Sequence, residues 1–142
     1  MLYSSKKTLL NDLKYDVFLS YNSSDKRNVF ALARRLKNDG IKVWYDDWEI
    51  KAGDDIYLKI EQGLAMSRTL VLIVSSHTFG SDWPVMEYTT SLFRDPCNKQ
   101  RRFIPLLIEN CTIPDTIRRF KYIDWRNQDA KQYKNLLRTI RF

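Results

Sequence analysis

The chemistry available to this chain is best judged from a tryptophan and a glutamate four residues apart, Trp83 and Glu87, in the segment SDWPVMEY. They follow the apolar run 70–74 and a short polar loop. If Ser81 or Asp82 caps a helix there, a spacing of four places the indole and the carboxylate on one helix face. That face would lie just beyond the carboxyl end of a strand, where open α/β sheets bind ligands. A carboxylate beside an aromatic ring in such a crevice is suited to stabilising a sugar cation.

Each of these two residues also has an ordinary structural explanation. A helix glutamate is usually exposed, and a tryptophan often packs a helix onto a sheet. The case for a site therefore depends on polar residues that end neighbouring predicted strands. Three such groups occur, and they would line one crevice with Trp83 and Glu87: Ser20-Tyr21-Asn22-Ser23, Asp46-Asp47 and Ser75-Ser76.

The residue inventory argues against other kinds of site. The 4 glycines are placed so that neither a GxGxxG dinucleotide fingerprint nor a Walker loop occurs. His77 is the only histidine, and no GxSxG motif accompanies it, so a surface histidine is favoured over a Ser-His-Asp triad. A metal site would need Asp46, Asp47 and further carboxylates to converge. We therefore predict no metal and no bound cofactor.

Short apolar runs and helical patterns alternate along the chain. Five runs have the length and composition of buried strands: 15–20, 41–45, 70–74, 102–108 and 122–125. Pro105 in the fourth run indicates an edge-ward or bulged strand, because proline cannot donate a backbone hydrogen bond. Residues 48–53 are predicted to form a loop.

The helical patterns lie between these runs. The first carries Val29, Phe30, Ala33 and Leu36 at three- and four-residue spacing and stops at Gly40. Others begin at Asp54-Asp55, at Ser81-Asp82, at Pro114, and before the stripe of Tyr133, Leu136, Leu137 and Ile140. This alternation predicts an α/β fold: a single flavodoxin-like, doubly wound sheet of five mostly parallel strands in the order 2-1-3-4-5, flanked by helices.

Composition is that of one globular domain. The chain has 142 residues, of which 44% are hydrophobic and 29% charged. No apolar run approaches the roughly 20 residues of a membrane span, and residues 1–14 contain no signal-peptide apolar segment. Cys97 and Cys111 form no CxxC pair. We expect a cytoplasmic protein with no membrane contact and with both thiols reduced.

The net charge of +7 arises in the last third of the chain. Residues 97–142 hold 11 lysines and arginines against 4 acidic residues, whereas residues 1–96 hold 13 of each sign. A basic end of this kind attracts anionic partners. A solvated face that aids solubility is the simpler explanation, and we do not predict nucleic-acid binding.

Three segments together resemble the successive motifs of a TIR domain. They are YDVFLSYNSSD (residues 15–25), VWYDDWEIKAGDDI (residues 43–56, which contains the BB loop of that family) and SRTLVLIVSSHTFGSDWPVMEY (residues 67–88). The last contains the W-x-x-x-E arrangement of the enzymatic, bacterial-type members. The resemblance covers nearly the whole chain and implies one TIR domain over residues 14–142 after an N-terminal tail, residues 1–13.

The resemblance implies an NAD⁺ glycohydrolase that cleaves the nicotinamide–ribose bond to ADP-ribose, to a cyclic variant of it, or to both. Glu87 falls on the catalytic glutamate of the family and Trp83 on the aromatic residue that packs near the substrate. NAD⁺ is thus the expected substrate and not a resident cofactor. Further substrate contacts are expected from the same crevice: Tyr21, Asn22, Ser23, Asp46, Lys51 and Ser75.

The family also assembles through its BB loop. Here the corresponding residues are Trp48, Glu49, Ile50, Lys51 and Gly53, and we expect other TIR domains as partners, with activation by self-association in a bacterial defence or immune-type pathway. Two alternatives stay open: an adaptor that signals through TIR–TIR contacts without catalysis, and a base-exchange enzyme that acts on NAD analogues.

Overall fold

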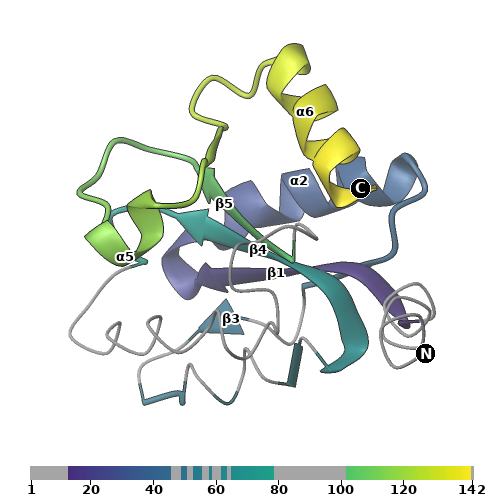
Figure 1. Cartoon of the computed structure of the whole chain (residues 1–142), viewed down its shortest axis with the longest axis horizontal. Coiled ribbons are helices and arrows are strands. Elements are labelled where there is room, and N and C mark those ends of the chain that lie inside the picture. The colour runs from purple at the N-terminus through teal and green to yellow at the C-terminus, as the bar shows by residue number, and fades with distance from the viewer. Residues whose placement is uncertain are drawn as a thin grey trace.

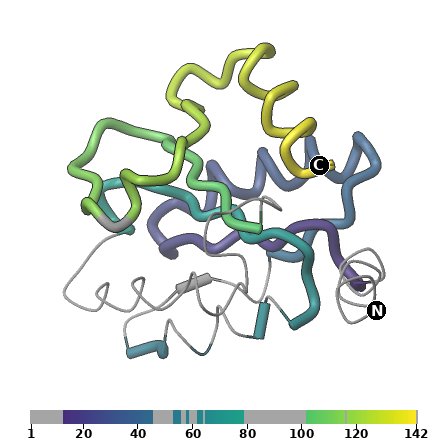
Figure 2. The backbone as a smooth tube through the Cα atoms, viewed as in Figure 1, coloured from purple at the N-terminus to yellow at the C-terminus, as the bar shows by residue number. Residues whose placement is uncertain are grey.

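A parallel β-sheet forms the centre of the molecule (Figure 1). The computed structural model describes residues 13–45, 49–50, 53–55, 58, 62–63, 65–78 and 102–141, which Figure 2 shows in colour. The main strands are β1 (Tyr15–Asn22), β2 (Val43–Trp44), β4 (Ser67–Val74), β5 (Phe103–Leu107) and β6 (Ile123–Asp124). They lie in the order β2-β1-β4-β5-β6, and every pairing is parallel. When these five strands are numbered 1 to 5 along the chain, their order in the sheet is 2-1-3-4-5, so the predicted order is confirmed.

The two faces of the sheet are covered by different helices, because alternate residues of each strand point to opposite sides. In β1, Val17 and Leu19 belong to a cluster that includes buried residues of helices α2 (Lys26–Asn38) and α6 (Ala130–Ile140). Phe18 points to the other face, in a cluster with residues around the short helix α5 (Asp115–Arg118). The fold is therefore doubly wound, as predicted.

Helix α2 buries a different stripe from the one predicted. Val29, Leu32, Ala33 and Leu36 are buried, whereas Phe30 is 47% exposed. One residue is about 100° of rotation on a helix, so Phe30 falls beside the buried face, where its ring packs edge-on against Tyr45 with centroids 6.3 Å apart. The prediction for Phe30 is wrong.

Two glycines have the roles that their positions require. The stop at Gly40 is confirmed: its φ is +87°, and Ile41 N closes the helix end by donating to Leu36 O at 3.0 Å. Gly63 is buried in a helical stretch that precedes β4, and a Cβ atom there would lie 2.5 Å from two ring atoms of Phe18. Only a glycine lets this backbone approach the sheet so closely.

The predicted loop after β2 contains a further strand. Residues Glu49–Ile50 form β3, which pairs in parallel with β1 in the register Tyr21↔Glu49 and Asn22↔Ile50. The pairing exists because β1 runs two residues past its predicted end at Ser20 and so offers backbone groups to a partner. Part of the segment 48–53 is thus held against the central sheet.

Pro105 lies in a strand that has neighbours on both sides. Its register with β4 is unbroken from Leu70↔Phe103 to Val74↔Leu107, so β5 is neither an edge strand nor bulged. The backbone carbonyl of Arg102 and the backbone N–H of Ile108 both form hydrogen bonds with β4. Because backbone groups alternate in direction along a strand, the odd-numbered residues between them, Pro105 included, direct their backbone groups toward β6. The β6 ladder begins only at Leu106, and the missing N–H of Pro105 therefore costs no ladder bond.

Arg102 is one of the 11 basic residues of the segment 97–142, but it lies in the interior and not on the surface. It is 8% exposed, and its guanidinium donates to the carbonyl oxygens of Arg68 at 2.9 Å and of Ser67 at 3.1 Å. Arg126 forms an ion pair with Asp124. The basic excess at the surface is smaller than the sequence count implies.

In the part of the chain that the structure describes, no helix is long and apolar enough to cross a membrane.

Candidate active site at the carboxyl edge of the sheet

Several residues predicted to contact substrate lie together where β1 and β4 end. Tyr21 and Asn22 close β1, and Ser23 begins the 3-10 turn η1 (Ser23–Asp25). Ser75 directly follows β4, the parallel neighbour of β1. Because parallel neighbours end on the same side, these residues meet at the carboxyl edge of the sheet.

Their side chains differ in what they offer to a ligand. Tyr21 and Ser75 are buried, Asn22 is half-buried and Ser23 is exposed. The Asn22 amide oxygen accepts from the backbone N–H of Ser24 at 2.9 Å and so shapes the turn. Gly53, which was predicted to belong to the BB loop, is exposed and has a φ of +89°, a backbone conformation that favours glycine.

Five predicted residues lie outside the described residues: Trp83, Glu87, Asp46, Trp48 and Lys51. The backbone of Glu49 and Ile50 is described as β3, and their side chains are not. Their roles stay predictions. What the structure provides is the end of β4 from which the segment carrying Trp83 and Glu87 departs.

A hydrogen-bond network fixes the turn after β4. The Ser75 hydroxyl donates to the buried Asp25 carboxylate at 2.5 Å and accepts from the backbone N–H of His77 at 3.1 Å. The backbone N–H of Ser75 donates to the Thr78 hydroxyl at 2.7 Å, and that hydroxyl donates to Ile73 O at 2.8 Å. The turn is thereby tied both to its own strand and to η1.

In this network Ser75 has a structural role, because its hydroxyl and its backbone N–H hold the turn in place. Its hydroxyl is donated to Asp25 and not to His77, so the serine is not arranged as the nucleophile of a Ser-His-Asp triad. Its contact with substrate stays a prediction. Asp25 itself was not among the predicted site residues, although it ends the segment YDVFLSYNSSD and was the acidic residue nearest to the polar turn.

A second carboxylate links the same turn to β5. Glu109 Oε1 accepts from the Ser76 hydroxyl at 2.6 Å and from the Ser76 backbone N–H at 2.7 Å. These bonds hold the pKa of the Glu109 carboxyl below its ordinary value, first through the hydroxyl and then through the amide. Glu109 was also missed from the sequence; its signal is its position directly after the strand run 102–108.

The edge continues to β6 with a fixed cation. The Arg126 guanidinium binds both carboxylate oxygens of Asp124, at 2.8 and 2.7 Å, and donates to the Asn110 side-chain oxygen at 2.5 Å. Hydrogen bonds from Arg126 lower the pKa of Asp124 to about 2. The charge of Arg126 is therefore balanced by Asp124 in a bidentate pair.

The comparison with protein families agrees with this architecture. A match to the TIR domain family covers residues 17–138. The chain is a TIR domain. Among solved structures, the TIR domain of the Toll-related receptor TRR-2 from Hydra magnipapillata superposes with a TM-score of 0.67 over 90% of this chain and 99% of that one. At 22% identity this likeness shows the fold alone.

Curated relatives of this TIR domain come from bacteria and archaea. The protein named NAD(+) hydrolase PdTIR of Paracoccus denitrificans is 36% identical over 93 residues, which is 65% of this chain and 31% of that protein. The probable 2' cyclic ADP-D-ribose synthase TcpB of Brucella abortus is 35% identical over 121 residues, or 84% of this chain and 47% of TcpB. The 2' cyclic ADP-D-ribose synthase BtTIR of Bacteroides thetaiotaomicron is 33% identical over 94 residues, 66% of this chain and 32% of BtTIR. The chain thus spans between 31% and 47% of the length of these relatives.

Proposed function

We propose that this TIR domain cleaves NAD⁺ at the nicotinamide–ribose bond, releasing nicotinamide and forming ADP-ribose, a cyclic ADP-ribose, or both. The observation that carries the proposal is its similarity to TIR proteins named for these two reactions, at 33–36% identity. The Trp83/Glu87 pair supports it, because in the sequence the pair follows β4, whose carboxyl end lies at the edge of the sheet where parallel α/β folds bind ligands.

Glu87 is proposed as the catalytic residue. Nicotinamide leaves as a neutral molecule from a cationic substrate, so the departure needs no strong general acid. The ribose that remains has oxocarbenium character, and a carboxylate beside it stabilises the positive charge as glycosidase carboxylates do. Capture by water then yields ADP-ribose, and capture by an atom of the same molecule yields a cyclic product.

Trp83 is proposed to pack against the substrate while it anchors its own helix. Tyr21, Asn22, Ser23 and Ser75 line the neighbouring strand ends, and Asp46 and Lys51 are proposed to complete the contacts from the other side of β1. The network of Ser75, Asp25 and Thr78 keeps this edge in one arrangement before substrate binds.

The decisive experiment replaces Glu87 and measures nicotinamide release from NAD⁺. Glu87→Gln keeps the shape of the side chain and removes its charge, so turnover should fall by about 10²-fold or more. Asp115→Asn is the matched control, because it removes one carboxylate from an exposed position on α5. Activity of Glu87→Gln within a few-fold of the unsubstituted domain would refute the assignment, and a domain that releases no nicotinamide at any concentration would favour the adaptor function.

Two tryptophan variants separate substrate binding from folding. Trp83→Phe should retain stability and lose part of the turnover, whereas Trp83→Ala should lower both the melting temperature and the rate. A Trp83→Ala variant unchanged in both respects would show that the residue is an ordinary surface side chain. The mass of the product distinguishes hydrolysis, cyclisation and exchange of the base.

Self-association through the BB loop is proposed to complete the site. The segment Trp48 to Gly53 would contact a neighbouring copy, with Trp48 at the centre. Activity per molecule should then rise with protein concentration, and Trp48→Ala should remove that rise without lowering the melting temperature. A large loss of stability in Trp48→Ala would show instead that the indole packs within its own domain.

We propose that residues 1–13 form a tail outside the domain, that the domain acts in the cytoplasm, and that it signals in bacterial defence. Truncation at Lys14 tests the first point, since the melting temperature and the activity should both be retained.

A further inference from the structure

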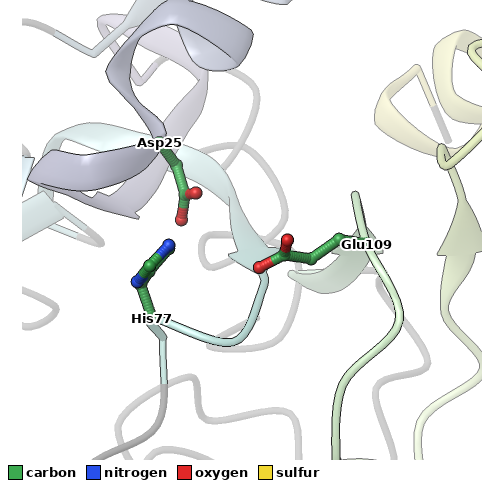
Figure 3. A group of neighbouring side chains, drawn as sticks. All are labelled: Asp25, His77 and Glu109. Carbon is green, nitrogen blue, oxygen red and sulfur yellow. The ribbon is translucent and has the colours of Figure 1, made fainter.

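Three potential metal ligands from distant parts of the sequence meet at the carboxyl edge of the sheet (Figure 3). Asp25 lies in η1 after β1, His77 in the turn after β4, and Glu109 after β5. One ligand atom from each residue lies within 4.8 Å of the other two. Figure 3 shows the Asp25 carboxylate directed toward the imidazole of His77, with the Glu109 carboxylate facing the same space.

Asp25 is the observation that points to a cation. The residue is only 5% exposed, and its Oδ2 accepts a single hydrogen bond from the Ser75 hydroxyl. It forms no ion pair with a lysine or arginine of the described residues, and its second oxygen has no donor there. The second oxygen of Asp25 is therefore available to bind a cation at this edge of the sheet.

We propose that Asp25, His77 and Glu109 bind a divalent transition-metal ion, with zinc the best match. An imidazole nitrogen with two carboxylate oxygens is a zinc-type ligand set, whereas magnesium and calcium favour oxygen ligands alone. Two carboxylates and a neutral imidazole balance the charge of the ion, and a water molecule fills the fourth tetrahedral position. The site would neutralise Asp25 and join the ends of β1, β4 and β5.

The distances permit this with a small closure. Ligand atoms around a tetrahedral zinc ion lie about 3.4 Å apart, given zinc–ligand bonds of roughly 2.0–2.2 Å. Asp25 is buried and fixed, but His77 is exposed and Glu109 is partly exposed, so those two side chains can approach by rotation. The two Ser76 hydrogen bonds engage Oε1 of Glu109 and leave Oε2 available.

Cys111 lies two residues after Glu109 and could bind a metal ion in place of one of the three proposed ligands. The Cys111 thiol is free and half-buried, so the experiment has to show whether it binds the metal. Cobalt(II) is a suitable probe, because its absorption spectrum distinguishes tetrahedral nitrogen–oxygen ligands from thiolate ligands, which add a sulfur-to-metal charge-transfer band.

The experiment titrates EDTA-treated protein with zinc chloride in a calorimeter and with cobalt(II) in a spectrophotometer. We expect one equivalent to bind, a tetrahedral cobalt spectrum without a thiolate band, and a higher melting temperature with zinc. Loss of a ligand should weaken binding by about 100-fold or more, at least the loss seen when an outer-shell partner is removed. Because His77 is exposed, His77→Gln tests this without disturbing the core, and Glu109→Gln tests the second ligand.

Cys111→Ser is the matched control and should bind zinc as the unsubstituted domain does. The inference is overturned if the domain binds no zinc, if His77→Gln binds as tightly as before, or if Cys111→Ser abolishes binding. These readouts do not involve NAD⁺, so they are independent of the proposed catalytic function.

Discussion

Gly63 offers a quantitative test of how closely the helix before β4 packs on the sheet. A Cβ atom at this position would lie 2.5 Å from Cε2 and from Cζ of Phe18, and 2.8 Å from Cε1. Ordinary carbon contacts are about 3.5–4.0 Å, so the ring or the helix has to move by about 1 Å. Phe18 is 0% exposed and packs among Leu70, Leu72 and Phe103, which leaves the ring little room.

Two opposing effects set the expected magnitude for Gly63→Ala. Helix propensity favours alanine by about 1 kcal/mol, while overpacking a filled core costs about 1–3 kcal/mol. Because the ring is fully buried, we expect the upper part of that range and a net loss of about 1–2 kcal/mol. For a domain of 142 residues this lowers the melting temperature by roughly 3–6 °C.

Urea denaturation measures this change, with an unaltered m-value showing that the unfolded state is the same. Gln62→Ala is the matched control, since Gln62 is exposed in the same helical stretch and its change should be close to neutral. Phe18→Leu removes the ring atoms that clash, so the double variant should be more stable than the two single changes predict, by about 1 kcal/mol. If Gly63→Ala alone stabilises the domain by about 1 kcal/mol and shows no coupling with Phe18, the close packing described above is incorrect.

Two further predictions concern hydrogen-bonded pairs of side chains. Tyr133→Phe should lose about 1 kcal/mol in urea denaturation, because the Tyr133 hydroxyl donates to Asp39 at 2.5 Å; an unchanged midpoint would show that the bond contributes nothing. NMR titration should find Asp124 with a pKa of about 2, and Arg126→Gln should return it toward 3.8. Since the folded pKa is depressed, the pair stabilises the fold above pH ~3.9, and the contribution is lost as the pH falls through about 2. Both side chains are partly exposed, so solvent screening keeps this contribution small.

The strand order was predictable from the sequence because each strand is a short apolar run and the runs alternate with helical patterns. A run such as Leu70 to Val74, buried on both faces, has no other stable place in a domain of this size. The boundaries were harder to predict. β4 begins earlier, at Ser67, where its ladder with β1 starts in the register Tyr15↔Ser67 and where the backbone carbonyl of Ser67 accepts a hydrogen bond from the buried Arg102 side chain.

The site was predictable only in outline. That polar residues meet at the carboxyl edge follows from parallel topology, so the positions of Tyr21 and Ser75 at the strand ends could be predicted, while their contact with substrate stays a prediction. Which side chains bind one another depends on contacts between residues far apart in the chain, and no local pattern links Ser75 to Asp25 or Ser76 to Glu109, 33 residues away. Such pairings require the three-dimensional arrangement of the turns.

The flanks of the sheet bear on how copies of this domain can associate. The two end positions of the strand order are occupied by β2 (Val43–Trp44) and β6 (Ile123–Asp124), each 2 residues long, while β1 and β4 in the interior have 8. Joining sheets side by side into a continuous ribbon, the geometry of amyloid, needs a long row of unpaired backbone groups, and neither of these two strands supplies one. Copies that associate would therefore be held by contacts between side chains and turns, and not by a shared sheet.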